Sequence, residues 1–192
     1  MRVISGSAKG RRLKRVPGDT TRPIMDRVKE SLFNILGLDV LETRWLDLFA
    51  GTGQVGIEAL SRGAAEVVFV DKVRPAILTI QENLRQTQLT TRAEVVQMDA
   101  FAYLNVPPSR PFDLIYIAPP QYKGLWLDVL HLVDVRPFTY LNPQGTAVVQ
   151  IDPKEMQPVE LLHLTLADDR RYGNTLLCFY EIGEAATPNF PV

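Results

Sequence analysis

Residues 46 to 56 combine an acid with closely spaced glycines, and these residue types suit the binding of a nucleotide-type cofactor. They read Leu-Asp-Leu-Phe-Ala-Gly-Thr-Gly-Gln-Val-Gly, an apolar run that ends in a glycine turn. Gly51 and Gly53 lack a Cβ, so the backbone can bend tightly there and approach a ligand closely. A helix beginning after the turn would add unpaired backbone N–H groups. The pattern predicts a cofactor site, and the alternative is a tight strand-to-helix turn without a ligand.

Two acids decide which cofactor the turn favours. The glycines Gly51, Gly53 and Gly56 satisfy G-x-G-x-x-G, and Asp71 follows the first of them by twenty positions, which fits a dinucleotide enzyme. An acid there accepts hydrogen bonds from ribose hydroxyls, which nicotinamide cofactors and S-adenosylmethionine (SAM) share. Asp47 precedes the glycines, where negative charge would not help a pyrophosphate but would attract the ammonium of methionine. The residues therefore favour SAM, and a nicotinamide dehydrogenase is the alternative.

A second candidate site follows residue 113, where an apolar run stops at paired prolines. The segment reads Asp-Leu-Ile-Tyr-Ile-Ala-Pro-Pro-Gln-Tyr and ends at Tyr122. Pro119 and Pro120 have no N–H, so the carbonyls ahead of them are free acceptors. An acceptor beside an aromatic ring could hold a flat base by its exocyclic amine. The alternatives are an ordinary strand-ending turn and a Tyr122 ring that packs on Trp126.

Positive charge is concentrated at the start of the chain. Residues 1 to 30 contain nine basic and three acidic side chains, a net charge of +6, so the other 162 residues sum to −7 and the whole chain to −1. A basic segment on an acidic protein is typical of a polyanion partner, although a solvated basic hairpin would have the same charge. The residues that we expect to contact RNA are Arg2, Lys9, Arg11, Arg12, Lys14, Arg15, Arg22 and Arg27.

Alternating strands and helices must position these residues. This alternation predicts a doubly wound, Rossmann-like α/β fold, with a seven-stranded, mostly parallel sheet in which a terminal hairpin through residues 170–174 makes one strand antiparallel. Residues 1–16 are expected to form an added basic β-hairpin. We expect helices over 21–36, 54–62, 74–87, 100–104 and 125–133, a turn at 141–145, and strands over 44–49, 66–70, 93–97, 113–117, 146–151, 160–167 and 175–182.

Composition limits the class of protein. The 192 residues, of which 46% are hydrophobic, suffice for one sizeable core. We expect a methyltransferase-sized domain over 17–183, the hairpin before it and a frayed tail over 184–192. No run approaches a membrane span and no signal-peptide pattern opens the chain, which predicts a cytoplasmic protein. The single cysteine, Cys178, lies in an apolar run and reads as a core residue, and with only His131 and His163 no metal site is expected.

Motifs along nearly the whole chain resemble those of the RsmD-type ribosomal RNA methyltransferases. The helix Asp26-Arg-Val-Lys-Glu-Ser-Leu-Phe ahead of the glycine turn is the most specific of them. The resemblance implies SAM as cofactor, no metal, and methylation of the exocyclic N2 of a guanine in small-subunit rRNA. The other matching segments are Met1-Arg-Val-Ile-Ser-Gly, Gly10-Arg-Arg-Leu, Thr21-Arg-Pro, Leu46-Asp-Leu-Phe-Ala-Gly-Thr-Gly, Glu58-Ala-Leu-Ser-Arg-Gly-Ala, Pro111-Phe-Asp-Leu, Lys123-Gly-Leu and Tyr172-Gly-Asn-Thr.

The same resemblance assigns roles to individual residues. Asp71, with Lys72 beside it, would meet the ribose, while Asp99 and Ala100 would meet the adenine. A helix N-cap is the competing role for Asp99. The residues implied at the methionine end are Asp47, Phe49, Gly51, Thr52 and Gly53.

One departure from the family concerns the target-base loop. The family pattern is Asp-Pro-Pro-Tyr, whereas this chain has Ala118 in place of the acid and Tyr122 one position late. Ala118 cannot accept a hydrogen bond, so the Pro119 carbonyl would orient the amine alone. The catalytic set is therefore expected to be Ala118, Pro119, Pro120 and Tyr122. The alternative is a non-catalytic rRNA-binding or ribosome assembly protein; in either case the expected partner is ribosomal RNA in a small-subunit particle, with no membrane and a monomer favoured.

Overall fold

The computed structural model describes residues 1–18 and 24–184. They divide into two compact units, Met1–Tyr103 and Leu104–Val192. The described strands belong to a seven-stranded, mostly parallel sheet, which confirms the predicted Rossmann-like α/β fold. None of the helices within the described ranges is long and apolar enough to cross a membrane.

The first unit contains three parallel strands that follow one another through helices. Strand β1 pairs with β2, and β2 pairs with β3. Asp47 stands opposite Phe69, and Asp71 stands opposite Gln97, so the carboxyl ends of the three strands lie at one edge. The elements are α1 (Asp26–Leu36), η1 (Gly37–Val40), β1 (Arg44–Asp47), α2 (Gln54–Ser61), β2 (Glu66–Asp71), α3 (Arg74–Thr87), η2 (Thr90–Arg92), β3 (Ala93–Gln97) and, at its end, α4 (Ala100–Leu104).

Helix α2 is buried along its whole length. Its glycine, Gly56, packs directly on β2, because a Cβ at that position would lie 2.3 Å from the Phe69 ring and 2.8 Å from the Val67 side chain. The third glycine of the G-x-G-x-x-G pattern is thus required by helix–sheet packing. This close packing places the start of α2 next to the end of β1. It thereby fixes the position of the glycine turn between the two elements.

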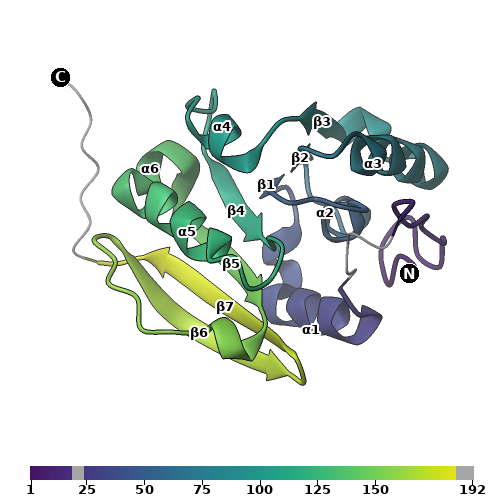
Figure 1. Cartoon of the computed structure of the whole chain (residues 1–192). Coiled ribbons are helices and arrows are strands. Elements are labelled where there is room, and N and C mark those ends of the chain that lie inside the picture. The colour runs from purple at the N-terminus through teal and green to yellow at the C-terminus, as the bar shows by residue number, and fades with distance from the viewer. Residues whose placement is uncertain (19–23, 185–192) are drawn as a thin grey trace. The chain divides into compact units, whose positions relative to one another are not determined.

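The basic N-terminal segment, residues 1–16, folds back on itself beside α2 and α3 (Figure 1). A single antiparallel bridge joins Arg2 and Arg12, with turns between them, so the expected hairpin is irregular. Gly6 approaches α2 so closely that a Cβ there would lie 1.8 Å from the Ser61 carbonyl oxygen. A side chain at residue 6 would therefore push the segment off the helix.

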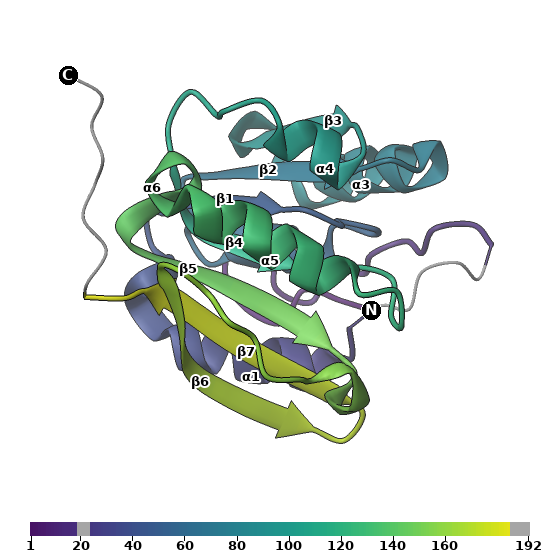
Figure 2. The ribbon, with the colours of Figure 1, turned by 60° about the vertical axis from the view of Figure 1, so that its left-hand side comes forward.

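The second unit contains a four-stranded part of the sheet with the order β4-β5-β7-β6. Strands β4 and β5 are parallel, whereas β7 is antiparallel to both β5 and β6, which confirms the single reversed strand. Figure 2 shows β5, β7 and β6 side by side. The elements are β4 (Phe112–Ile117), α5 (Leu125–Val135), α6 (Pro137–Tyr140), β5 (Leu141–Ile151), η3 (Pro153–Glu155), β6 (Leu164–Tyr172) and β7 (Thr175–Ile182).

Two predictions for this unit were wrong in detail. The strand expected over 160–167 begins at Leu164 and runs to Tyr172, because the buried Asp134 carboxylate accepts the N–H groups of residues 162, 163 and 164 at 2.7 to 2.8 Å. The loop before β6 is thereby tied to α5. The turn expected over 141–145 lies inside β5 as a register shift, since Leu141 pairs with Phe112 and Thr146 pairs with Leu114.

Candidate functional site

The Asp47 carboxylate lies at the end of β1, buried, and faces the first turn of α2. Its Oδ2 accepts the Gly56 N–H at 3.4 Å. Burial raises the pKa of Asp47 from 3.8 to about 7; the Gly56 hydrogen bond opposes the shift, and the nearby charge of Asp71 adds to it. The site therefore holds a carboxyl group that ionises near neutral pH and that a cationic ligand group would stabilise in its charged form.

The glycine turn connects Asp47 to the end of β2. Gly51 and Gly53 have φ values of 53° and 73°, the left-handed region that favours glycine. The Gly51 N–H donates to Asp71 Oδ2 at 2.9 Å, and the Val73 N–H donates to Asp71 Oδ1 at 2.8 Å. Each carboxylate oxygen keeps a second lone pair, so Asp71 can still accept hydrogen bonds from a diol.

Thr52 and Phe49 complete the turn. Thr52 is buried, its hydroxyl lies 3.6 Å from Met1 Sδ, and its carbonyl accepts the Asn83 Nδ2–H at 2.9 Å. Phe49 is half-buried. The turn is thus held from α3 as well as from the two strands.

The residues after β3 lie at the same edge of the sheet. Asp99 Oδ1 accepts the Phe101 N–H at 3.0 Å, the capping contact of α4, while Oδ2 lies 3.7 Å from Lys72 Nζ. Ala100 is buried at the start of α4. The capping role that competed for Asp99 is present in the structure, and it uses one of the two oxygens. An adenine contact through the other oxygen stays a prediction.

The residues of this edge fit SAM by their chemistry. A buried acid suits the methionine ammonium, the left-handed glycines allow close approach of a ligand to the backbone, and an acid at the end of β2 suits a ribose. Among the residues that the structure describes, no group of three or more His, Cys, Asp or Glu side chains is placed to hold a metal ion.

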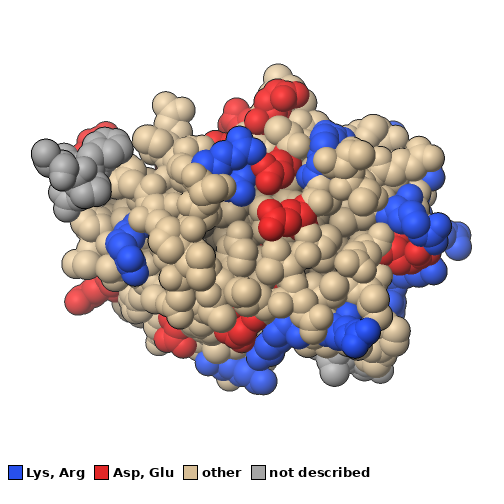
Figure 3. Space-filling model, turned by 90° about the horizontal axis from the view of Figure 1, so that it is seen from above, with Lys and Arg blue, Asp and Glu red and all other residues tan. Residues whose placement is uncertain are grey.

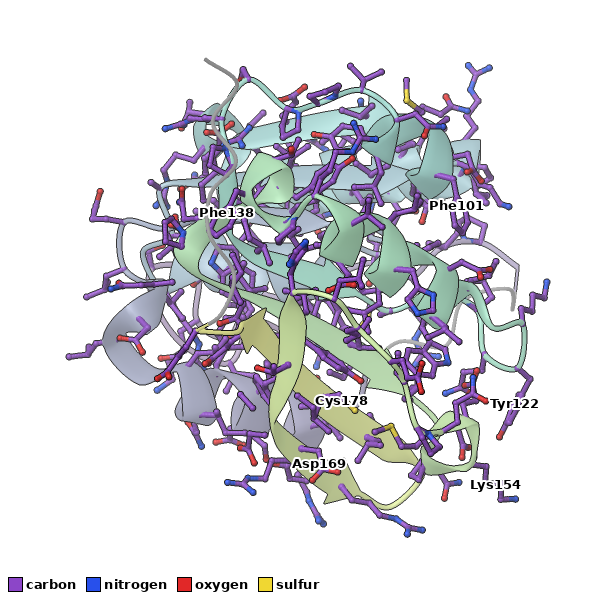
Figure 4. The ribbon with its side chains drawn as sticks, turned by 90° about the vertical axis from the view of Figure 1, so that its left-hand side faces the viewer. Phe101, Tyr122, Phe138, Lys154, Asp169 and Cys178 are labelled. Carbon is purple, nitrogen blue, oxygen red and sulfur yellow. The ribbon has the colours of Figure 1, made fainter. Side chains whose placement is uncertain are left out.

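The target-base loop follows β4 in the second unit. Pro119 is buried, Ala118 is half-buried, and Tyr122 is 64% exposed. Tyr122 has a φ of 60°, which is strained for a side chain of this size. Its N–H donates to Glu155 Oε2 at 2.8 Å and its hydroxyl to Asp152 Oδ2 at 2.7 Å. Glu155 belongs to the short helix η3, and Figure 4 shows Tyr122 near Lys154, the residue before it in that helix.

Helix η3 therefore holds an exposed aromatic ring in a defined place. Asp152 also caps η3 by accepting the Lys154 N–H at 2.9 Å. That hydrogen bond and the one from Tyr122 lower the pKa of Asp152. The sequence analysis did not identify Asp152 or Glu155, because a Pro-Lys-Glu turn after a strand is not typical of any particular function. The Asp-Pro-Lys-Glu capping pattern is the signal that could have identified them.

The basic residues predicted to contact RNA fall into two groups. The first group has side chains that are already engaged: Arg11 donates to the Gln86 carbonyl at 2.7 Å, Lys14 pairs with Glu82 at 3.0 Å, and Arg2 lies 3.8 Å from Asp26. The second group is exposed, and its side chains make no hydrogen bond or ion pair with the described residues. It consists of Lys9, Arg12, Arg15 and Arg27. Arg22 lies outside the described residues.

Charge on the surface is mixed. On the face seen from above in Figure 3, Lys and Arg side chains are interspersed with Asp and Glu. The positive side chains on this face are thus separated by negative ones.

Buried polar residues that the sequence analysis missed dock the N-terminal segment. Glu58, fully buried on α2, accepts the N–H groups of Ile4 and Ser5 at 2.8 and 2.9 Å and pairs with Lys29 at 3.1 Å and Arg62 at 2.9 Å. Burial lowers the pKa of Lys29, and Glu58 opposes that shift. The sequence does contain a signal for this ion pair: Glu58 is a charged residue in a mainly apolar helix, and it stands four positions before Arg62.

The chain matches known proteins over nearly its whole length. The family model described as Conserved hypothetical protein 95 matches residues 1–181. YlbH of Bacillus subtilis (strain 168), provisionally named an rRNA methyltransferase, is 40% identical over 183 residues, which cover 94% of this chain and 98% of that protein. "Ribosomal RNA small subunit methyltransferase D" of Escherichia coli (strain K12) is 34% identical over 134 residues, 70% of this chain and 67% of that protein.

Solved structures agree with the fold. The structure of yhhF from Escherichia coli has a TM-score of 0.80 at 30% identity and covers 95% of this chain and 97% of that one. An RNA methyltransferase from Salinibacter ruber, solved with S-adenosyl-L-homocysteine, has a TM-score of 0.64 at 16% identity, with 88% and 98% covered, and supports the fold alone. The family match and the identities together show that this chain belongs to the RsmD-type family of rRNA methyltransferases.

Proposed function

We propose that this protein transfers a methyl group from SAM to the exocyclic N2 amine of a guanine in small-subunit rRNA. The observation that carries the proposal is the buried Asp47 carboxylate beside a left-handed glycine turn, a site with a place for a cation. The family relationship supplies the class of reaction, and the name of its E. coli member supplies the class of substrate.

The first unit would bind the cofactor. Bound SAM would supply a methyl group carried on a positively charged sulfur. Asp47 would pair with the methionine ammonium, Asp71 would accept the ribose hydroxyls, and Asp99 with Ala100 would contact the adenine, while Phe49, Thr52 and Lys72 would border the ligand. We propose residues 17–183 as the domain that carries the reaction.

The loop after β4 would receive the guanine. The Pro119 carbonyl would accept a hydrogen bond from the amine and orient its lone pair, and the exposed Tyr122 ring would stack on the base. As the N–C bond forms, the C–S bond breaks and the amine loses a proton, which an aqueous site can accept without a strong general base. Positioning would thus supply most of the acceleration, and the guanine must leave its stack to reach the loop.

The exposed cations of residues 1–16 would bind the RNA backbone. Their affinity for phosphate is sequence-independent, so they would position the RNA while the loop selects the base. The substrate would be the rRNA of a small-subunit particle, and the protein would act without a metal.

The direct test is methyl transfer from labelled SAM to small-subunit particles that lack the modification. We expect label in the rRNA as N2-methylguanine, and none when Asp47→Asn replaces the wild-type chain at SAM concentrations near its Kd. Measurable SAM binding and RNA binding without any transfer would overturn the enzymatic proposal and favour the RNA-binding alternative that Ala118 suggests.

A further inference from the structure

The Asn83 side chain joins the basic N-terminal segment to the cofactor turn. Asn83 lies on α3 with no exposed surface. Its Oδ1 accepts the Lys14 N–H at 2.7 Å, and its Nδ2 donates to the carbonyls of Lys14 at 3.1 Å and Thr52 at 2.9 Å. One planar amide therefore contacts the backbone of both segments through three of the four hydrogen bonds that an Asn side chain can make.

The two segments that meet at Asn83 have separate roles in the proposed function. Thr52 stands between Gly51 and Gly53 in the cofactor turn, whereas Lys14 stands between Leu13 and Arg15 in the basic segment. Leu13 is buried and Arg15 is exposed. The segment is therefore anchored by the side chain before residue 14, and the side chain after it presents a positive charge to solvent.

Neighbouring contacts restrict independent movement of the two segments. Helix α3 also holds the segment through Glu82, which pairs with Lys14 Nζ, and through the Gln86 carbonyl, which binds Arg11. The Met1 Sδ contact with the Thr52 hydroxyl is a second link to the turn. Because the amide is rigid and buried, a shift of the Thr52 carbonyl changes the hydrogen bonds that Lys14 makes.

We infer that Asn83 is a positioning residue that couples the two ligands, so that rRNA on the basic segment and SAM in the turn strengthen each other's binding. Each ligand orders one of the two segments that are hydrogen-bonded to the Asn83 amide. The other segment is then more ordered before the second ligand binds to it. Linkage requires the effect to be reciprocal. This inference rests on the proposed function.

The test compares the affinity for S-adenosyl-L-homocysteine, measured by calorimetry, with and without a small-subunit rRNA transcript. We expect the transcript to lower the Kd of the wild-type chain about fivefold or more. Asn83→Asp keeps an acceptor for the Lys14 N–H but turns the donor of Nδ2 into an acceptor. We expect the ratio of the two Kd values to fall close to one in this variant.

A matched control loosens the same segment without touching the turn. Ser61 Oγ accepts the Ala8 N–H at 2.9 Å and donates to the Ser5 carbonyl at 2.6 Å, both on the side of α2. Ser61→Ala should keep the ratio of the wild-type chain. If the ratio of the two Kd values falls equally in both variants, the inference is overturned, because any loosening of the segment would then abolish the coupling.

A second measurement needs no variant and covers the case in which Asn83→Asp does not fold. Hydrogen exchange at the Lys14 amide of the wild-type chain should slow several-fold when S-adenosyl-L-homocysteine is added. An unchanged rate, with both ligands binding and a Kd ratio of one, overturns the coupling and leaves the proposed function intact. Absence of S-adenosyl-L-homocysteine binding overturns both, whereas absence of transcript binding overturns the coupling alone, because the proposed substrate is the rRNA of a particle.

Discussion

The Asp47 carboxylate and the Gly56 N–H, 3.4 Å apart, are the polar contact between the end of β1 and the first turn of α2. The contact is long, so it compensates only weakly for the removal of the carboxylate from water. The acid therefore has a pKa of about 7. A group of this kind makes both folding and ligand binding depend on pH.

We expect the ligand-free protein to lose stability as the pH rises from about 4 to 7. The folded chain holds the Asp47 proton up to a pKa of about 7, whereas the unfolded chain releases it near 3.8, so deprotonation favours unfolding in this range. The full loss is on the order of 4 kcal/mol. Urea unfolding at pH 5 and pH 8 should show about 2 to 3 kcal/mol of this loss, because the rest has already occurred below pH 5. Asp47→Asn should flatten this part of the profile, whereas Asp39→Asn, at an exposed position of η1, should leave it unchanged.

SAM binding should show the opposite trend with pH. The ammonium pairs with an ionised Asp47, and the ionised fraction rises roughly tenfold between pH 6 and pH 8 for a pKa near 7. We expect the association constant to rise about fivefold up to pH 8 and to fall at higher pH, because the ligand's own α-amino group loses its proton at a pKa of about 7.7 to 8.0. Calorimetry with SAM across this range is the measurement. An unchanged affinity in the wild-type chain would show that Asp47 does not meet the cation.

The exposed cations should contribute to RNA binding more than the engaged ones. Arg12→Gln and Arg15→Gln should each reduce the slope of log K against log salt by about 0.7 to 0.9, the value for one phosphate contact. Arg11→Gln is the matched control from the same segment, since its side chain already donates to the Gln86 carbonyl. Filter binding of the rRNA transcript over a series of salt concentrations measures the slopes. Equal effects at residues 11 and 12 would contradict the division into two groups.

Restoring the family acid should raise turnover. Ala118→Asp returns an acceptor for the target amine, and one hydrogen bond of about 1 to 3 kcal/mol corresponds to roughly ten- to hundredfold in rate. Single-turnover methylation of particles measures the chemical step. Gln121→Asp adds the same charge to the same loop and should not raise the rate. No gain from Ala118→Asp would count for a protein that has lost the reaction.

The Tyr122 ring should matter more than its hydroxyl. Tyr122→Ala removes a base-stacking surface worth about 1 to 3 kcal/mol, so we expect a KM for particles that rises between several-fold and a hundredfold. Tyr122→Phe keeps the ring and loses the hydrogen bond from the hydroxyl to Asp152, and its KM should change little. The KM for SAM serves as the internal control, because neither variant alters the first unit. A Phe variant as weak as the Ala variant would assign the role to the hydroxyl.

Much of the first unit could be predicted because its signals are local. Helix 74–87 and strand 93–97 have the predicted bounds. The helix expected over 21–36 begins only at Asp26, but it ends as predicted at Leu36, before Gly37 with a φ of 53°. Apolar periodicity and glycine geometry act within a few residues, so they can be recognised in one sequence. The acid and glycines of the turn were found for the same reason.

The remaining features depend on contacts between distant residues. Strand β6 begins late because Asp134, thirty positions away, binds the N–H groups before it, and its exposed residues show no clear alternation. Asn83 looks like an ordinary polar helix residue until Lys14 and Thr52 are placed around it. A polar residue on the apolar stripe of a helix, such as Asn83 beside Ile80 and Leu84, is the local signal that indicates such a buried contact.

The burial of Glu58 predicts how RNA would leave the protein in the proposed function. Its carboxylate accepts the N–H groups of Ile4 and Ser5 and pairs with Lys29, whose Nζ also donates to the Arg2 carbonyl at 2.6 Å. Lifting the first residues off α2 would therefore remove three hydrogen bonds from a buried ion pair. We expect product release to occur by breaking phosphate contacts one at a time, with the protein scaffold beneath them unchanged. Slow hydrogen exchange at residues 4 and 5 throughout turnover would agree with such stepwise release, and rapid exchange would mean that the scaffold itself opens.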